Sequence, residues 1–237
     1  MARSENRKKS STSTGMKRFR FDPVALVTST PFIFCVVVLL AIAIIAGIVL
    51  YHPPYTFNDE DDPSNGLRSL SHHARVFADY LSPESKDIVE FLVKTSTAHP
   101  QTFNIIYKNL PQKDSPLSVE MAQAAECALP QDIFWDLSAA FYDKQYLFTV
   151  AEKQTDSVLF ADRLIADFVN RINAEKVDAM NTCLQQKKYT YLLDADRKEA
   201  ESLGVDSAPV VFLDEEKYTT LDALQKAITD KLDVSSK

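Results

Sequence analysis

The chain has 237 residues, of which 46% are hydrophobic and 25% charged, a composition typical of a folded protein. The net charge is −7, yet residues 1–22 hold seven Lys or Arg against only two acids, so the remainder is strongly acidic. An acidic domain of this kind argues against nucleic-acid binding. The sequence also lacks a phosphate-binding loop, a zinc signature, a nucleophile elbow and a dinucleotide fingerprint, so we expect no metal and no cofactor.

A long apolar segment follows the basic tail. From Val24 to Tyr51 there are 28 residues without a charged side chain. About 20 apolar residues span the hydrocarbon core of a bilayer, whereas the apolar core of a cleaved signal peptide has about 7–15. Cleavage is the competing interpretation, and the length favours an uncleaved signal-anchor over residues 23–51. The basic residues before it predict a single-pass protein of the cell membrane, with residues 1–22 in the cytoplasm and the rest extracytoplasmic.

A polar segment and then an amphipathic one follow the apolar segment. Proline, aspartate and asparagine dominate residues 52–66, which predicts a solvated linker. Apolar residues then recur three or four apart from Leu67 to Leu81, which predicts an amphipathic helix at the start of a folded domain, 67–237. His72 and His73 fall beside this apolar face, and the spacing supplies no further metal ligands. We interpret both as solvated helix residues.

Two short apolar runs predict the first strands. The sequence DIVEFLV, Asp87 to Val93, is typical of a buried strand, and TFNIIY, Thr102 to Tyr107, predicts the next one. Only about eight residues separate the two runs, while a parallel crossover usually needs a dozen or more. The connection is therefore expected to be a loop.

Helical patterns dominate the middle of the chain. Leu117 to Gln145 predicts two consecutive helices separated at Pro130, and apolar stripes predict two more near 158–172 and 177–184. Together they form a helical region of about 115–190. A helix over 192–203 ending at Gly204 and a closing helix over 221–232 complete the expected helices.

The order of residues within two stretches indicates a family. AQAAECA, then Pro130, then QDIFWDLSAAFYDKQ resembles the inserted helical region of DsbA-like thiol-disulfide oxidoreductases. LGVDSAPVVFLD, Leu203 to Asp214, resembles a loop found throughout the thioredoxin superfamily. This resemblance implies a core strand at 210–213 and an edge strand that begins at 217–218. The resemblance implies an α/β fold that is thioredoxin-like with an inserted helical domain, preceded here by one N-terminal transmembrane helix.

The resemblance also implies where a redox site would lie. In this family the first core strand leads into a C-x-x-C motif whose first cysteine begins a helix, where the helix dipole stabilises the thiolate. If IVEF at 88–91 is that strand, Ser96-Thr97-Ala98-His99 occupies the motif, and neither Ser96 nor His99 can exchange with a disulfide. We interpret both as vestigial motif positions, with Pro100 leaving no room for the activating helix. His99 is otherwise a loop histidine or a lone functional residue.

Three further assignments follow from the resemblance. Some relatives pair cysteines at the positions of Cys127 and Cys183, which implies a structural disulfide. Two buried thiols, or a relocated redox pair, are the alternatives. Ala208-Pro209 would be the cis peptide of the loop that holds extended peptides. Cys35 lies within the apolar segment and is interpreted as inert.

These features predict a membrane-anchored protein without dithiol chemistry. We expect it to act by binding an unfolded or extended polypeptide, or an envelope protein, as a chaperone or scaffold, and not to bind nucleic acid. The alternative is a thiol-disulfide oxidoreductase that uses Cys127 and Cys183 as a non-standard redox pair.

Overall fold

The computed structural model describes residues 34–42 and 56–235, and the chain divides into two compact units, 1–53 and 54–237. Within the first unit, residues 34–42 are helical. The predicted basic tail and most of the predicted anchor lie outside the described residues. In the part of the chain that is described, no helix combines the length and the apolar character needed to cross a membrane.

The second unit is built on a five-stranded sheet with the strand order β1-β3-β2-β4-β5. The parallel pair β2 and β3 forms its centre, with Val76 opposite Tyr107, and the other neighbouring strands are antiparallel. The strands are β1 (Ser64–Asn65), β2 (His72–Ala78), β3 (Phe103–Asn109), β4 (Val210–Leu213) and β5 (Glu216–Tyr218).

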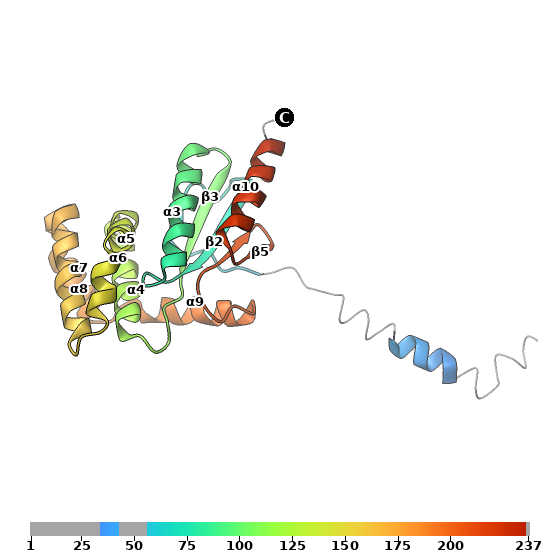
Figure 1. The fold of residues 1–237 in the computed structure, drawn as a ribbon, viewed down its shortest axis with the longest axis horizontal. Coiled ribbons are helices and arrows are strands. Elements are labelled where there is room, and N and C mark those ends of the chain that lie inside the picture. The colour runs from blue at the N-terminus through green and yellow to red at the C-terminus, as the bar shows by residue number, and fades with distance from the viewer. Residues whose placement is uncertain (1–33, 43–55, 236–237) are drawn as a thin grey trace, which may run out of the picture. The chain divides into compact units, whose positions relative to one another are not determined.

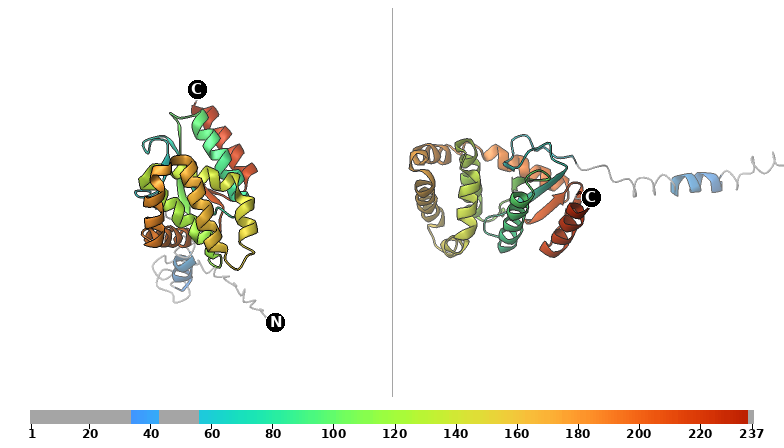
Figure 2. Two further views of the ribbon diagram at one scale, coloured as in Figure 1. Left: turned by 90° about the vertical axis from the view of Figure 1, so that its left-hand side faces the viewer. Right: turned by 90° about the horizontal axis from the view of Figure 1, so that it is seen from above.

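Helices cover both faces of this sheet (Figure 1, Figure 2). On one face α3 (Pro83–Ala98) and α10 (Leu221–Ser235) lie side by side, and they bury Val76 and its neighbours in the larger core. On the other face α9 (Thr190–Ser202) covers Phe77 and Phe212. Successive strand residues point to opposite faces, so Val76 and Phe77 serve different cores.

The inserted helices pack at one end of the sheet, between β3 and α9 in the sequence (Figure 1). The predicted helices over 117–145, 158–172 and 177–184 are confirmed, as are those over 192–203 and 221–232 and the strands at 102–107, 210–213 and 217–218. The insertion consists of α4 (Pro116–Ala128), η1 (Leu129–Gln131), α5 (Phe134–Asp143), α6 (Gln145–Ala151), α7 (Ser157–Asn173), η2 (Ala174–Lys176) and α8 (Val177–Gln185). The result is the α/β architecture with a helical insertion that the resemblance implies.

The helix predicted over 67–81 is wrong. Its central part is β2, and His72 and His73 are strand residues. β2 is covered on both faces, so Ala74, Val76 and Phe77 are all fully buried and the alternation that marks a half-exposed strand is hidden. His72 is not simply solvated either, because its Nδ1 atom lies 3.1 Å from the carboxylate of Asp214.

The strand predicted at Asp87–Val93 is also wrong, because these residues form the middle of α3. A short apolar run does not by itself distinguish a buried strand from a buried helix face. The decisive signals lie upstream. Ser82 caps the helix by accepting a hydrogen bond from the Ser85 N–H at 3.1 Å, and Pro83 follows at the first helical position. The connection between the parallel strands is therefore a full helix and not a short loop.

Residues 56–65, here called the N-terminal strap, are packed on the domain and do not behave as the predicted solvated linker. Phe57 packs against Phe212 with ring centroids 5.3 Å apart, and the Arg75 guanidinium lies 4.2 Å from the Phe57 ring centroid. Asp59 forms an ion pair with Arg75 at 2.8 Å. The strap ends in β1, which pairs with β3. The acidic composition that predicted a linker instead supplies partners for buried cations.

The most buried of these cations is a lysine at the centre of the domain. Lys108 in β3 has no exposed surface, and its ammonium donates hydrogen bonds to the Asn58 carbonyl at 2.8 Å, to the Asp62 carboxylate and to Glu199 at 3.1 Å. Burial acts to lower the pKa of Lys108, but the neighbouring carboxylates outweigh it and raise that pKa. Because a buried charge must be paired, this ammonium holds the strap and α9 to the same strand.

Two further buried carboxyl groups lie next to this lysine. Asp196 accepts a hydrogen bond from the Asn109 N–H at 2.7 Å, and Glu126 accepts one from the Asn109 side chain at 2.6 Å. Burial raises the pKa of Asp196 well above its usual range and raises the pKa of Glu126 to about 7. The second carboxyl oxygen of Glu126 has no hydrogen-bond partner among the described residues, which disfavours its charged form.

The raised pKa of Glu126 makes stability depend on pH. The folded chain keeps a proton that the unfolded chain releases between the ordinary pKa of 4.5 and about 7. The free energy of unfolding therefore falls as the pH rises through this range and levels off above it. Burying the ionised form of Glu126 costs stability at alkaline pH.

We expect Glu126→Gln to reduce this pH dependence, because the amide keeps the acceptor for Asn109 but cannot ionise. The fall in the free energy of unfolding between about pH 5 and pH 8 should be smaller than in the wild type by on the order of 3 kcal/mol. Urea denaturation of the full chain in detergent, followed by the fluorescence of the sole tryptophan, Trp135, measures it. Glu175→Gln, at an exposed position, is the control. Equal slopes for Glu126→Gln and wild type would contradict the assignment.

Candidate functional site

A hollow of the described domain lies at the N-terminus of α3. It has a volume of about 680 Å³, and its walls are the start of α3, the segment after β3, α9 and the loop before β4. The Ala208-Pro209 peptide bond in that loop is cis, which agrees with the resemblance. The lining residues are Asp79, Ser82, Glu84, Leu110, Pro111, Gln112, Lys113, Arg197, Glu201, Val205, Asp206, Ser207 and Ala208. We call this hollow the α3 groove.

A buried carboxyl group forms part of the wall of the α3 groove. Asp79 is 2% exposed and accepts hydrogen bonds from the Ser118 hydroxyl at 2.6 Å, the Gln112 side chain at 2.9 Å and the Leu81 N–H at 3.1 Å. Burial raises the pKa of Asp79 despite these bonds. All three donors are neutral. The arrangement ties the end of β2 to the start of α4 across the groove.

Two serines stand at the start of α3, where the chain leaves the central strand. The Ser82 hydroxyl accepts the Ser85 N–H and donates to the Glu84 carboxylate at 3.1 Å, while the Ser85 hydroxyl accepts the Asp79 N–H at 3.2 Å. Both hydroxyls therefore serve as local hydrogen-bonding groups. A serine hydroxyl cannot attack or form a disulfide, so this pair supports no thiol-disulfide exchange.

The predicted vestigial motif positions are wrong, because they lie at the other end of this helix. Ser96 is buried in the last turn of α3, where its hydroxyl donates to the Asn65 carbonyl at 2.9 Å, and His99 is the residue that ends the helix. The N-terminal amides and the positive end of the dipole are absent there. The error follows from the misplaced first strand. The Ser-Pro pair at 82–83, a helix-start signal, could have corrected it.

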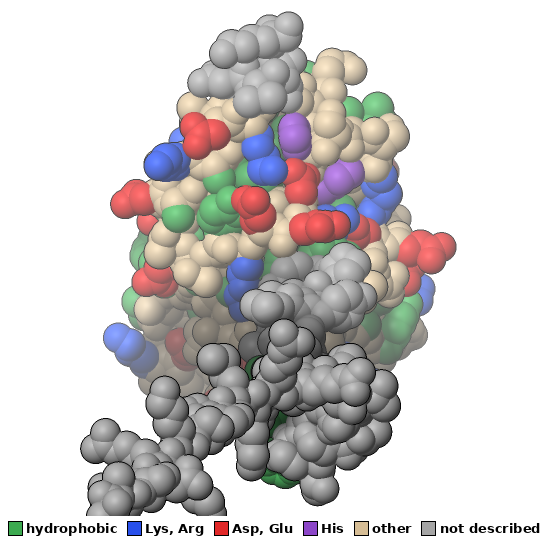
Figure 3. Space-filling view, turned by 90° about the vertical axis from the view of Figure 1, so that its right-hand side faces the viewer, with side chains coloured by type: hydrophobic (Ala, Val, Ile, Leu, Met, Phe, Trp, Pro, Cys, Tyr) green, Lys and Arg blue, Asp and Glu red, His purple; other side chains and the backbone are tan. Residues whose placement is uncertain are grey.

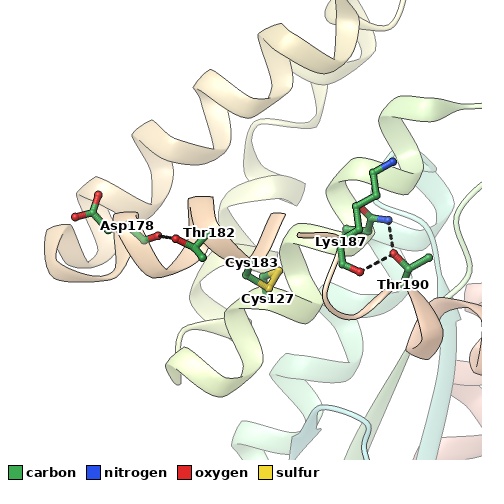
Figure 4. The surroundings of a disulfide bond; sticks show 7 residues. Cys127, Asp178, Thr182, Cys183, Lys187 and Thr190 are labelled. Atoms are coloured by element: carbon green, nitrogen blue, oxygen red, sulfur yellow. Dashed lines mark hydrogen bonds between the residues drawn. A yellow bond between two sulfur atoms is a disulfide. The ribbon is translucent and has the colours of Figure 1, made fainter. Parts of the chain in front are cut away.

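The structure contains the disulfide between Cys127 in α4 and Cys183 in α8, with Cα atoms 5.9 Å apart (Figure 4). The two cysteines are 1% and 7% exposed. Closing the loop between them, with a sequence separation of 56, contributes on the order of 4 kcal/mol in the chain-entropy model. Burial restricts access of an attacking thiolate, so the geometry favours a structural bridge over a redox pair.

The start of α9 is joined to α4 close to this bridge. The Thr190 hydroxyl donates to the Lys187 carbonyl at 3.0 Å and accepts a hydrogen bond from the Gln123 side chain at 3.0 Å (Figure 4). The bridge and this pair of hydrogen bonds therefore attach both α8 and the start of α9 to α4.

The histidines do not form a metal site within the part of the chain that is described, where no cluster of His, Cys, Asp and Glu could hold a metal ion. Figure 3 shows histidine side chains on a face where acidic and basic groups are intermixed. His73 accepts or donates a 3.3 Å hydrogen bond with Asn104, and burial lowers the pKa of its imidazole. We assign His72 and His73 a structural role at the start of β2, through their contacts with Asp214 and Asn104.

Comparison with known sequences identifies the family. The sequence model described as thioredoxin matches residues 83–230, which is more than half of the chain. The chain belongs to the thioredoxin family. Among curated proteins, none matches the sequence.

Solved structures of DsbA-like members of the thioredoxin superfamily share the fold with this thioredoxin-family chain. Oxidised BdbD from Bacillus subtilis is 15% identical, with a TM-score of 0.61 over 76% of this chain and 97% of that one. The catalytic domain of Proteus mirabilis ScsC is 20% identical, with a TM-score of 0.55 over 74% and 92%. The thiol-disulfide exchange protein α-DsbA2 from Wolbachia pipientis is 21% identical, with a TM-score of 0.52 over 73% and 88%. At these identities the likeness concerns the fold alone.

The resemblance to DsbA-like proteins implies that the C-x-x-C motif would lie at the start of α3, beside the cis-proline loop. This chain has Ser82-Pro83-Glu84-Ser85 there. The helix that would activate a thiolate is therefore present, contrary to the expectation that it had been lost with the motif. What is missing is the pair of sulfur atoms.

We expect Ser82→Cys/Ser85→Cys to create a thiol-disulfide oxidoreductase, because the helix N-terminus stabilises a thiolate and lowers the thiol pKa below about 8.5. Insulin reduction by the full chain in detergent should rise at least about tenfold above the wild type, a barrier change of about 1.4 kcal/mol.

The matched control is Ser96→Cys/His99→Cys, which places the same spacing at the wrong end of α3 and should remain inactive. An inactive Ser82→Cys/Ser85→Cys variant would refute the placement of the motif. Catalysis of insulin reduction by the wild type would instead indicate that Cys127 and Cys183 act as a redox pair.

Proposed function

We propose that the chain is a membrane-anchored, extracytoplasmic protein that has no dithiol chemistry and binds extended polypeptide in the α3 groove, as a chaperone or scaffold. The observation that carries the proposal is the serine pair at the start of α3, of which Ser82 lines an open groove beside a cis-proline loop. The reactive atoms are replaced, yet the surface on which a substrate chain would lie is retained. Function depends on the site and not on the fold. In this proposal the thiols would serve exchange chemistry, while the groove and its loop would serve binding, so binding does not require the thiols.

The loop before β4 offers free backbone groups to such a peptide. Within the described chain, the backbone N–H and C=O groups of Asp206, Ser207 and Ala208 make no hydrogen bonds to other protein groups. They lie next to β4, in the direction in which its strand would be extended. An extended peptide can pair with backbone groups of this kind, as in β-strand addition, with side-chain pockets supplying selectivity.

The groove also has apolar surface for a bound side chain. Leu110, Pro111 and Val205 are buried residues that line it beside the polar groups. A hollow of about 680 Å³ lies within the range of small-ligand sites and accommodates a few side chains of a peptide. Apolar walls with polar groups at the edge suit an unfolded segment better than a single polar metabolite.

The membrane anchor in this proposal rests on the charge-free run from Val24 to Tyr51 and the basic residues before it. We expect the full chain to stay with the membrane fraction after an alkaline carbonate wash, and a chain lacking residues 1–51 to be released. A full chain found in the wash supernatant would contradict the anchor. The position of a C-terminal protease-sensitive tag in intact cells reports on which side the domain lies.

Binding in the groove is tested by filling it. Ser207 is an exposed lining residue, so Ser207→Trp should block access and weaken binding of a fluorescent, cysteine-free unfolded peptide at least about tenfold. Fluorescence anisotropy with the full chain in detergent measures the affinity. Gln154→Trp, an exposed position in the insertion that does not line the groove, should bind like the wild type. A wild type that binds no peptide, or equal binding by Ser207→Trp, would overturn the proposed function.

A further inference from the structure

The side chains that line the α3 groove are unequal in charge. Four of them are carboxyl groups, those of Asp79, Glu84, Glu201 and Asp206, while only Lys113 and Arg197 carry positive charge. A groove with such an excess repels acidic segments and attracts basic ones. Electrostatic complementarity of this kind mainly sets specificity and association rate.

The two cations of the groove already have partners. Lys113 forms an ion pair with Glu201 at 3.2 Å, and the Arg197 guanidinium donates to the Pro111 carbonyl at 3.2 Å. The ion pair offsets the charge of Glu201, whereas Arg197 bonds a neutral carbonyl and keeps its positive charge. Among the charges of the groove that are left unpaired, Glu84 and Asp206 therefore outnumber Arg197.

The remaining acids form no ion pair with any described residue. Among the described residues, Glu84 accepts a hydrogen bond from the Ser82 hydroxyl alone, and Asp206 has no charged partner. Buried Asp79 is bonded only by neutral donors. Glu84 comes from the start of α3 and Asp206 from the cis-proline loop, so the two exposed acids belong to different walls of the groove.

The free backbone of residues 206–208 determines what kind of ligand can use these acids. A peptide paired with that backbone runs past the start of α3 and places successive side chains on alternate sides. Its side chains would reach the apolar surface of Leu110 and Val205 and the carboxylates of Glu84 and Asp206. A long Lys or Arg stem can pack on the apolar surface while its head reaches a carboxylate.

We propose that the α3 groove selects extended polypeptide segments in which Lys or Arg adjoins an apolar residue, with Glu84 and Asp206 as the residues that recognise the basic side chain. This inference rests on the proposed function and adds the class of segment that the groove prefers. The chain would thus discriminate among unfolded segments by charge and would reject acidic ones.

The test compares three fluorescent, cysteine-free peptides of equal length. Each carries the same Val-Leu pair, flanked by Lys, by Gln or by Glu, and binding to the full chain in detergent is followed by anisotropy. The Lys peptide should bind about tenfold more tightly than the Gln peptide at low salt, and the Glu peptide should bind most weakly. The preference should shrink at about 1 M salt, where the Debye length is about 3 Å.

Variants locate the preference. Glu84→Gln/Asp206→Asn should bind the Lys and Gln peptides within about twofold of each other, while Glu175→Gln/Asp230→Asn, at exposed positions outside the groove, should keep the wild-type preference. Glu84→Lys/Asp206→Lys should prefer the Glu peptide. That reversal is a gain of binding, which misfolding cannot produce.

The outcomes separate this inference from the proposed function. If no peptide binds the wild type, the proposed function fails. If all three peptides bind equally, the groove binds polypeptide and the charge selectivity is refuted. A Lys preference that survives Glu84→Gln/Asp206→Asn would place recognition elsewhere and overturn the assignment of these two residues.

Discussion

The burial of one ammonium group constrains the arrangement of the whole domain. Lys108 lies in the strand next to the central one, with no exposed surface, and its partners come from the N-terminal strap and from α9. The next residue, Asn109, binds Asp196 of α9 and Glu126 of α4. Because an unpaired buried charge is far more costly than a paired one, the strap and α9 stabilise this strand by pairing its ammonium group. One polar cluster thereby joins the strap, the sheet, α9 and the insertion.

The groove at the start of α3 results from that arrangement. Ser82 lies just beyond the C-terminal end of the central strand β2, α9 forms one wall of the groove, and the cis-proline loop forms another. The DsbA-like structures share the fold, and the resemblance places the redox motif at the start of α3, where this chain has Ser82 and Ser85. Ser82 caps the helix and the Ser85 hydroxyl accepts a hydrogen bond from the Asp79 N–H, so two hydroxyl groups hold this end of the groove in place.

The elements that the sequence predicted correctly and those it did not differ in their environment. The helices α7 and α10 each expose one face, so their apolar residues recur with a clear helical period. β2 is buried on both faces, so its apolar residues show no clear alternation, and the apolar run within α3 is too short for its period to distinguish a helix from a strand. Because the first core strand was predicted at Asp87–Val93, the expected position of the motif fell at Ser96 and not at Ser82. The prediction of a solvated linker failed for another reason. A segment that neutralises buried cations has the same acidic composition as a solvated linker.

The sequence by itself determined the family, the helical insertion, the loop around Pro209 and the absence of any C-x-x-C pair, because these depend on local order along the chain. The pairing of Cys127 with Cys183 was implied by resemblance and is present in the structure. Only the tertiary structure decided which residues begin α3, which side chains line the groove and which acids are neutralised. Those properties depend on contacts between segments distant in the sequence, such as Asp62 with Lys108 and Glu84 beside the loop of Ala208. No local pattern encodes them, since each partner alone is an ordinary charged or polar residue.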